Sequence, residues 1–179
     1  MSIIQKLFGK KTKEANMTVC GLANAGKTSV INYLMYGEAR STIPTMGLSV
    51  NKIDFPKLHL NIFDLGGQKG FRNFWTQINE KSDALVYIVD GVERNDIEES
   101  REVFHTIVNT QINNKIPVLL LLNKADLPDC MSRAEFIESF GLVDLAPKIN
   151  WAVYKTSAMT GKGLVEAFTY FIHTIEEES

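Results

Sequence analysis

The stretch GLANAGKT, residues 21–28, constrains the fold more than any other part of this chain. It fits the pattern G-x-x-x-x-G-K-[ST], follows a short apolar run and opens an apparent helix. In that context, Gly21 and Gly26 let the backbone turn its N–H groups inward, and the helix N-terminus adds positive potential. The stretch therefore predicts a phosphate-binding loop. The alternative is an ordinary glycine-rich turn that Thr28 caps.

Predicted strands and helices alternate along the chain. The apolar runs typical of strands are 17–22, 48–55, 58–65, 84–90, 117–126 and 151–158, and helical periodicity covers 27–35, 98–112 and 163–177. Two of the strand runs are separated only by Pro56 and Lys57, which predicts a hairpin. The runs 84–90 and 117–126 are almost continuously apolar, as in parallel strands covered on both faces. We therefore predict a three-layer α/β fold, with helices flanking a mixed, mostly parallel sheet of about six strands and ligands at the strands' carboxyl ends.

Composition sets the broad class of protein. The chain has 179 residues, 45% of them hydrophobic and 22% charged, with a net charge of -2, so we expect one globular domain. Cys20 and Cys130 lack metal-like spacing and favour a reducing, cytoplasmic location. No apolar run reaches the roughly 18–20 residues of a membrane span, and the N-terminus lacks a signal peptide pattern. Near-neutral charge does not by itself decide about nucleic acid; we expect no nucleic-acid partner and a monomer.

The end of the run 117–126 indicates which nucleotide is bound. Asn123, Lys124 and Asp126 directly follow the apolar residues, where side chains of one loop can converge on a planar ring. A carboxylate accepts from two adjacent donors, and guanine presents them at N1–H and its N2 amine, whereas adenine does not. Asp126 therefore predicts guanine and argues against an ATP-dependent P-loop kinase. The alternative is a turn at the strand end that Asn123 and Asp126 stabilise.

Taken together, these motifs resemble the Arf/Arl family of small GTPases over nearly the whole chain. GLANAGKT resembles the family's phosphate loop, STIPTMG (41–47) its first switch, FDLGGQKGFRNFW (63–75) its second switch, NKADLP (123–128) its base-specificity loop and TSAMTGKGL (156–164) the loop over the base. The string Ile43-Pro44-Thr45-x-Gly47 and the double glycine before Gln68 are similar to Arf proteins in particular. The resemblance implies a P-loop GTPase fold, GTP and GDP as ligands, Mg²⁺, and a role in membrane trafficking.

The resemblance also implies a set of site residues. Those expected to bind the nucleotide are Asn24, Ala25, Gly26, Lys27, Thr28, Ser29, Thr45, Gly67, Asn123, Lys124, Asp126, Ser157, Ala158 and Met159. The Ala158 N–H would bond guanine O6, Lys124 would lie along the base, and Asn123 would tie the base loop to the phosphate loop. Thr28 and Thr45 would bind Mg²⁺, and Asp64 would hold its water shell.

For hydrolysis, the expected catalytic residues are Gln68, Lys27 and Thr45. Lys27 would reach the β- and γ-phosphates, and Thr45 would sense the γ-phosphate. Gly67 would donate its N–H to that phosphate, and Gln68 would orient the attacking water. Asp64 as a strand-end cap and Gln68 as a solvated loop residue are the alternatives.

No arginine is obviously placed to assist hydrolysis, and Arg40 is better explained as a solvated loop residue. We therefore expect slow turnover and a GTPase-activating protein (GAP) that supplies an arginine. At position 23 the chain has Ala, where Arf-like sequences commonly carry Asp and many other small GTPases carry Gly. A methyl group beside Gln68 can hinder the water, so a GTP-binding scaffold with little or no hydrolysis is the alternative function.

Residues 1–13 are predicted to form an amphipathic helix ahead of a GTPase domain at 14–179. Ile3, Ile4, Leu7 and Phe8 repeat at helical spacing, with four lysines among them, so residues 2–13 are candidates for weak contact with anionic membranes. The alternative is a helix that stays packed on the domain. Ser2 excludes N-myristoylation. The expected location is therefore cytoplasmic, with a peripheral membrane contact as an option.

Segments 38–50 and 64–80 are expected to bind a guanine nucleotide exchange factor, a GAP and effectors. Leu48, Phe63 and Ile78 stand where Arf proteins commonly carry aromatic residues, while Trp75 is kept. This more aliphatic surface suggests different effectors.

Overall fold

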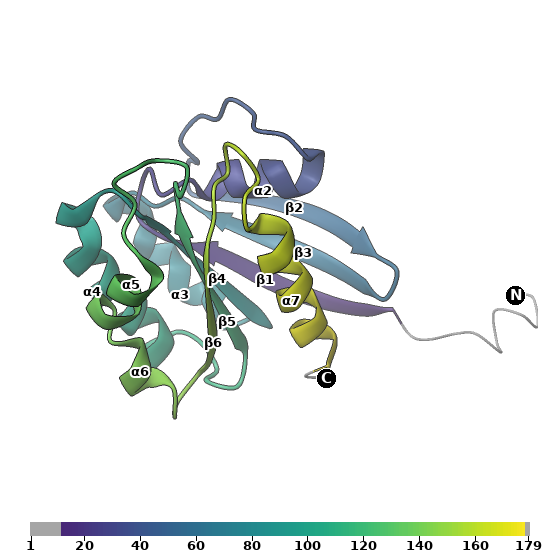
Figure 1. Ribbon diagram of the computed structural model, residues 1–179. Helices are drawn as coiled ribbons and strands as arrows, with labels where there is room; N and C mark the ends of the chain where they lie inside the picture. Colours follow the sequence, from purple (N-terminus) through teal and green to yellow (C-terminus); the bar gives the residue numbers. More distant parts are fainter. Residues whose placement is uncertain (1–11, 178–179) are drawn as a thin grey trace, which may run out of the picture.

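The computed structural model describes residues 12–177 (Figure 1). In this part of the chain six strands form one sheet in the order β2-β3-β1-β4-β5-β6, and only β2 runs antiparallel to its neighbour. The strands are β1 (Lys13–Cys20), β2 (Leu48–Phe55), β3 (Leu58–Leu65), β4 (Ala84–Asp90), β5 (Pro117–Asn123) and β6 (Asn150–Lys155). The predicted mixed, mostly parallel sheet is confirmed.

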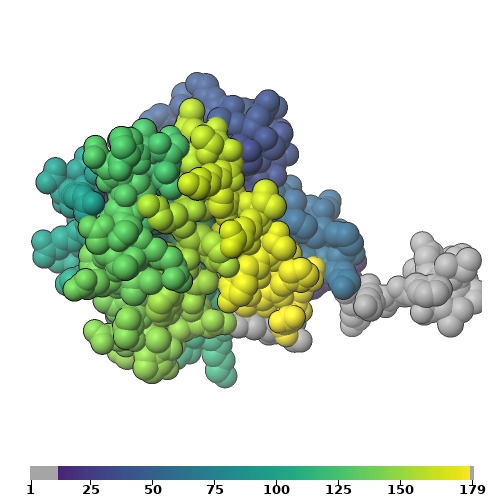
Figure 2. All heavy atoms as spheres, viewed as in Figure 1, coloured from purple at the N-terminus to yellow at the C-terminus, as the bar shows by residue number. Residues whose placement is uncertain are grey.

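Helices cover both faces of the sheet. They are α2 (Lys27–Tyr36), η1 (Lys69–Phe74), α3 (Trp75–Asn79), η2 (Arg94–Asp96), α4 (Ile97–Thr110), α5 (Arg133–Ser139), α6 (Leu142–Leu145) and α7 (Leu164–Glu177). One apolar core joins α2 and α7 to one face, and a second joins α3, α4, α5 and α6 to the other. Figures 1 and 2 show α7 on the side turned to the viewer, beside the α5–α6 region. The three predicted layers are therefore present.

Strand β4 shows why this sequence forms a central strand. Val86 and Ile88 belong to the core under α2 and α7, whereas Leu85 and Tyr87 belong to the opposite core. Successive side chains of a strand point to opposite faces, so a continuous apolar run is buried on both. The two-sided burial predicted for the runs at 84–90 and 117–126 is confirmed for β4 and β5.

Several predicted boundaries were wrong. The strand predicted at 17–22 spans Lys13–Cys20, because pairing with β3 begins at Lys13 and Leu58. The strands predicted to reach 126 and 158 end at Asn123 and Lys155, where polar loop residues of the candidate site begin. The short helices α3, α5 and α6 were not predicted.

The predicted amphipathic helix at residues 1–13 and the membrane contact at residues 2–13 concern residues that, apart from 12 and 13, lie outside the described part of the chain. Lys13 is in β1, so the helix prediction was wrong at that residue. Between residues 12 and 177, no helix is long and apolar enough to cross a membrane.

Candidate functional site

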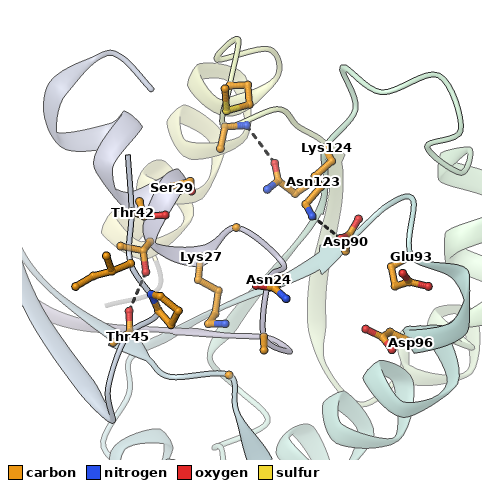
Figure 3. A pocket seen from close by; sticks show the side chains of 18 of the residues that line it. Asn24, Lys27, Ser29, Thr42, Thr45, Asp90, Glu93, Asp96, Asn123 and Lys124 are labelled. Carbon is orange, nitrogen blue, oxygen red and sulfur yellow. Dashed lines mark hydrogen bonds and ion pairs between the residues drawn. The ribbon is translucent and has the colours of Figure 1, made fainter. Parts of the chain in front are cut away.

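A cavity of about 970 Å³ opens at the carboxyl ends of β1, β4 and β5 (Figure 3). The predicted site residues that line it are Asn24, Gly26, Lys27, Thr28, Ser29, Thr45, Gly67, Gln68, Asn123, Lys124, Asp126, Ala158 and Met159. A cavity of this size accommodates a small-molecule ligand. The structure thus brings together residues from all five of the sequence motifs described above.

Three predicted residues, Ala25, Asp64 and Ser157, are buried and do not line the cavity directly. The Ala25 carbonyl accepts a hydrogen bond from Asn123 Nδ2 at 2.9 Å. The Ser157 hydroxyl accepts from the N–H groups of Met159 and Thr160. Ala25 and Ser157 therefore hold the shape of the two loops that line the cavity.

The phosphate loop has the backbone that its glycines predict. Asn24 and Gly26 adopt left-handed conformations, with φ of 64° and 94°, and a Cβ at Gly26 would collide with the Asn123 side chain. This position requires glycine for two separate reasons. The buried Lys27 ammonium donates to the Leu22 carbonyl at 2.8 Å, inside the same loop. Burial lowers the pKa of Lys27, and the nearby Asp64 carboxylate opposes that shift.

Beside Lys27, two hydroxyl groups meet a buried carboxylate. Thr28 Oγ1 and Thr45 Oγ1 donate to Asp64 Oδ2 at 2.7 and 3.2 Å and lie 2.9 Å apart. Burial raises the pKa of Asp64, while the bonds from Thr28 and Thr45 and the charge of Lys27 oppose that shift. Asp64 Oδ1 is buried and has no hydrogen-bond partner among the described residues. Hydroxyl and carboxylate oxygens suit a hard cation such as Mg²⁺, and an unsatisfied carboxylate oxygen can accept from one of its waters.

The base-specificity loop is tied to its neighbours. Asn123 Nδ2 bonds the phosphate loop at Ala25, and Asn123 Oδ1 accepts from the Ala158 N–H at 3.2 Å. For the predicted bond from the Ala158 N–H to guanine O6, this N–H would therefore have to be shared with Asn123 Oδ1 or released from it. Lys124 Nζ pairs with Asp90 Oδ2 at 2.5 Å (Figure 3). Asp126 is exposed and lines the cavity.

Sequence reasoning missed an acidic side of the cavity. Asp90, Glu93 and Asp96 line it across from Lys27 and Thr45 (Figure 3). All three follow β4 or end it, at the same edge of the sheet as the other site residues. The rule that ligands bind at the carboxyl ends of parallel strands was the signal that could have found them. Arg40, by contrast, does not line the cavity; it pairs with Glu38 and stacks on Tyr36.

With this geometry established, comparison with known proteins decides the family. The family model of the ADP-ribosylation factor family, Arf, matches residues 1–175. The chain belongs to the Arf family. Membership makes it a P-loop GTPase and a binder of GTP and GDP.

Two relatives show the extent of the similarity. This Arf-family chain is 34% identical over 177 residues to ADP-ribosylation factor 1 of Brassica rapa subsp. pekinensis and to ADP-ribosylation factor 3 of Arabidopsis thaliana. Each alignment covers 99% of this chain and 96% of the relative. The similarity therefore extends over the full domain.

A solved structure confirms the fold. The Arl6 BBS3 small GTPase from Trypanosoma brucei, with the bound nucleotide analogue GppNp, superposes with a TM-score of 0.83. The match covers 93% of this chain and 100% of the other at 23% sequence identity. The predicted P-loop GTPase architecture is thereby confirmed.

Proposed function

We propose that this Arf-family GTPase is a molecular switch that binds GTP or GDP with Mg²⁺ and hydrolyses GTP slowly on its own. A GAP accelerates the reaction, and the nucleotide controls partner binding. The observation that carries the proposal is the contact of Thr45 with Thr28 and Asp64. Thr45 comes from the loop before β2, whereas Thr28 belongs to the phosphate loop. A ligand that binds between them couples the first switch to the nucleotide.

The proposed roles follow from positions around the cavity. Lys27 and the phosphate-loop N–H groups bind the phosphates, Thr28 and Thr45 hold Mg²⁺, and Asp64 orients the metal's water shell. When bound, Mg²⁺ neutralises charge on the β- and γ-phosphate oxygens. Gly67 lies against this region, since a Cβ on it would lie 2.5 Å from Lys27 Nζ. Its N–H contacts the γ-phosphate, and Gln68 orients the attacking water.

Replacing Gln68 with Leu is expected to slow single-turnover hydrolysis of bound GTP about 100-fold, because a positioned catalytic group typically contributes at least that much. The measurement is phosphate release from preloaded protein. Gln77→Leu is the matched control, since Gln77 is exposed on α3 and does not line the cavity. Equal rates for wild type and Gln68→Leu would remove Gln68 from the mechanism.

The alternative is a GTP-binding scaffold with little or no turnover, and Ala23 is the feature that favours it. Ala23 lines the cavity with Gln68, and a Cβ on Gly67 would lie 2.5 Å from the Ala23 backbone N. A methyl group here stands beside the proposed path of the water. If neither wild type nor Gln68→Leu releases phosphate, even with candidate GAPs, the scaffold replaces the hydrolysing switch.

Removal of Mg²⁺ tests the metal assignment. Chelation with EDTA is expected to accelerate release of fluorescent GDP about 10- to 150-fold, the equivalent of one charged contact of 1.5–3 kcal/mol. The control is Asp64→Asn, which removes a carboxylate proposed to orient the waters of Mg²⁺. In this variant EDTA should accelerate GDP release less than it does in the wild type. A release rate that EDTA leaves unchanged in the wild type would exclude a Mg²⁺ ion bridging protein and phosphate.

The partner surfaces proposed are segments 38–50 and 64–80, which would bind an exchange factor, a GAP and effectors. In these segments Ile43, Met46, Leu48, Val50 and Phe74 are exposed, each at least 42% accessible. Exposed apolar side chains that gather near a ligand site favour partner binding. We further propose a cytoplasmic protein that contacts anionic membranes weakly through residues 2–13.

A further inference from the structure

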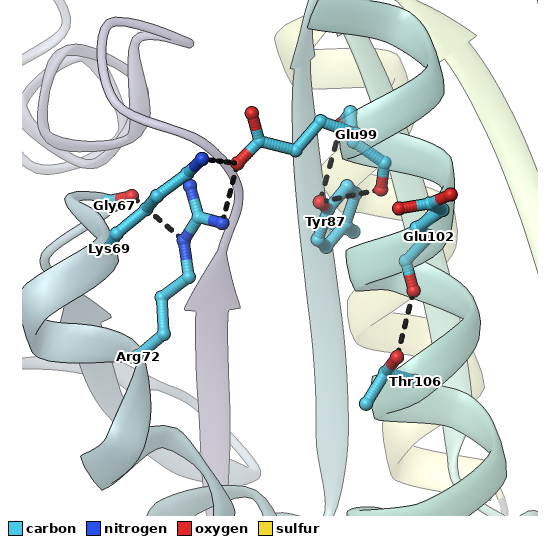
Figure 4. Close-up of polar contacts among 8 residues, drawn as sticks. Gly67, Lys69, Arg72, Tyr87, Glu99, Glu102 and Thr106 are labelled. Atoms are coloured by element: carbon cyan, nitrogen blue, oxygen red, sulfur yellow. Dashed lines mark hydrogen bonds and ion pairs between the residues drawn. The ribbon is translucent and has the colours of Figure 1, made fainter.

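Two side chains hold the backbone of the second switch at the double glycine. Trp75 Nε1 donates to the Gly66 carbonyl, and Arg72 Nε donates to the Gly67 carbonyl, both at 3.2 Å. Trp75 is 1% exposed and begins α3, so its indole is fixed by the core. Figure 4 shows the Arg72 bond to Gly67 and the second contact that Arg72 makes, with Glu99 on α4.

A donor on one carbonyl also sets the direction of the next N–H, because the peptide group is planar and trans. The Gly66 carbonyl shares its peptide plane with the Gly67 N–H, and the Gly67 carbonyl shares its plane with the Gln68 N–H. Trp75 therefore fixes the direction of the Gly67 N–H, while Arg72 fixes the orientation of the peptide group between Gly67 and Gln68. Arg72 does not line the cavity, so it acts on the peptide before Gln68, the residue proposed to position water, from outside the site.

Glu99 determines where the Arg72 guanidinium lies. Its Oε1 accepts from Arg72 Nη1 at 2.8 Å, and the Arg72 side chain is only 19% exposed. Lys69 also approaches Glu99, at 3.5 Å, but it is 79% exposed and contributes little positional restraint. The hydrogen bond from Arg72 is the main cause that lowers the pKa of Glu99, so this carboxylate is charged at neutral pH. The arginine fork can hold both acceptors at once, which a lysine amine cannot do with the same geometry.

Helix α4 gives Glu99 a rigid base. The next residue, Ser100, is buried, and its carbonyl accepts a hydrogen bond from the buried Tyr87 hydroxyl on β4 at 3.0 Å. Phe104, one turn further, packs on the Tyr87 ring with centroids 5.1 Å apart. The chain of contacts therefore runs from the central sheet through α4 to Glu99, Arg72 and the Gly67 carbonyl (Figure 4).

We propose that Glu99 is a positioning residue for GTP hydrolysis, acting through Arg72 to hold the Gly67–Gln68 peptide in its productive orientation. The inference rests on the proposed roles of Gly67 and Gln68. It adds that the second switch is clamped from α4, a helix that lies outside both predicted switch segments. The contacts from Glu99 through Arg72 to Gly67, here called the clamp, affect only nucleotides that contain a γ-phosphate. GDP lacks the γ-phosphate that the Gly67 N–H would contact, so the clamp should not change GDP affinity.

The test compares Glu99→Ala, Arg72→Ala and the double variant in two assays: single-turnover hydrolysis, and the ratio of affinities for a non-hydrolysable GTP analogue and GDP. Glu99→Ala is expected to lower both the rate and the ratio about 10-fold, the size of one charge-assisted hydrogen bond, with GDP affinity unchanged. The double variant should be no slower than the slower single variant, because the two residues act as a unit. Glu99→Gln keeps an acceptor oxygen and should restore part of the loss.

Glu102→Ala is the matched control. Glu102 is an exposed carboxylate on the same helix, one turn beyond Glu99, and Figure 4 shows it away from Arg72. Its removal should change neither assay, and thermal unfolding of every variant reports on folding.

The inference is overturned if the effects of Glu99→Ala and Arg72→Ala multiply, if Glu99→Ala weakens GDP as much as the GTP analogue, or if it leaves the affinity ratio unchanged. A different result separates this inference from the proposed function. If Gln68→Leu hydrolyses GTP at the wild-type rate while Glu99→Ala lowers the ratio of GTP-analogue to GDP affinity, Gln68 has no role in hydrolysis, but the clamp on Gly67 is retained.

Discussion

Replacing Asp126 with Asn is expected to abolish the preference for guanine, with GTP affinity falling by roughly 10⁴-fold, the discrimination seen when a polar partner is lost. A carboxylate can accept from both the N1–H and the N2 amine of guanine, whereas an amide presents one acceptor and two donors. Xanthine carries a carbonyl in place of that amine, so the variant should gain affinity for xanthosine triphosphate. The measurement is displacement of a fluorescent guanine nucleotide by GTP, ATP and xanthosine triphosphate.

Asp129→Asn provides the matched control for that substitution. Asp129 is an exposed aspartate three residues further along, and it does not line the candidate site. Its replacement should leave all three affinities unchanged. Tighter binding of ATP than GTP by the wild type, or a retained GTP preference in Asp126→Asn, would show that Asp126 does not select the base.

Addition of a GAP that supplies an arginine is expected to raise the single-turnover rate by about 10³- to 10⁵-fold. In the described part of the chain, no arginine lines the cavity. Arg40 is engaged with Glu38 and Tyr36, and Arg72 with Gly67 and Glu99. Within residues 12–177, no arginine is therefore placed to stabilise the charge that develops on the transferring phosphoryl group, and we expect a partner's arginine to supply that stabilisation.

The control for this experiment is the same GAP with its arginine replaced by alanine, which should bind but stimulate far less. Gln68→Leu should respond weakly to either form, because its water is not oriented. A rate that rises equally with both forms of the GAP would show that the partner acts by ordering the switches rather than by providing charge.

Sequence reasoning predicted best where one strong local signal decides the structure. The hairpin strands β2 and β3 and the central strand β4 have the predicted bounds, since Pro56 separates the first two and the apolar residues of β4 end at Asp90. The phosphate loop and the loop at 123–128, which is predicted to select the base, also line one cavity, as the order of parallel strands requires.

Other features depend on contacts that no local pattern records. The pairing of Lys13 with Leu58 extends β1 beyond its apolar part. The bridge from Glu99 to Arg72 joins residues far apart in the sequence, so it could be found only from the fold. Helix α5 is a different case, because Ser132 and Glu135 form a capping box whose S-x-x-E pattern is a local signal for a helix start.

The nucleotide that accompanies the purified protein tests the central claim most directly. Native protein is desalted, denatured, and its released nucleotide is identified by chromatography and quantified against protein. We predict GDP or GTP at about one per chain, since the cavity has one phosphate loop and one base-specificity loop. Release of adenine nucleotide, or nucleotide-free protein that does not bind added GDP, would contradict the assignment of this site to guanine nucleotide.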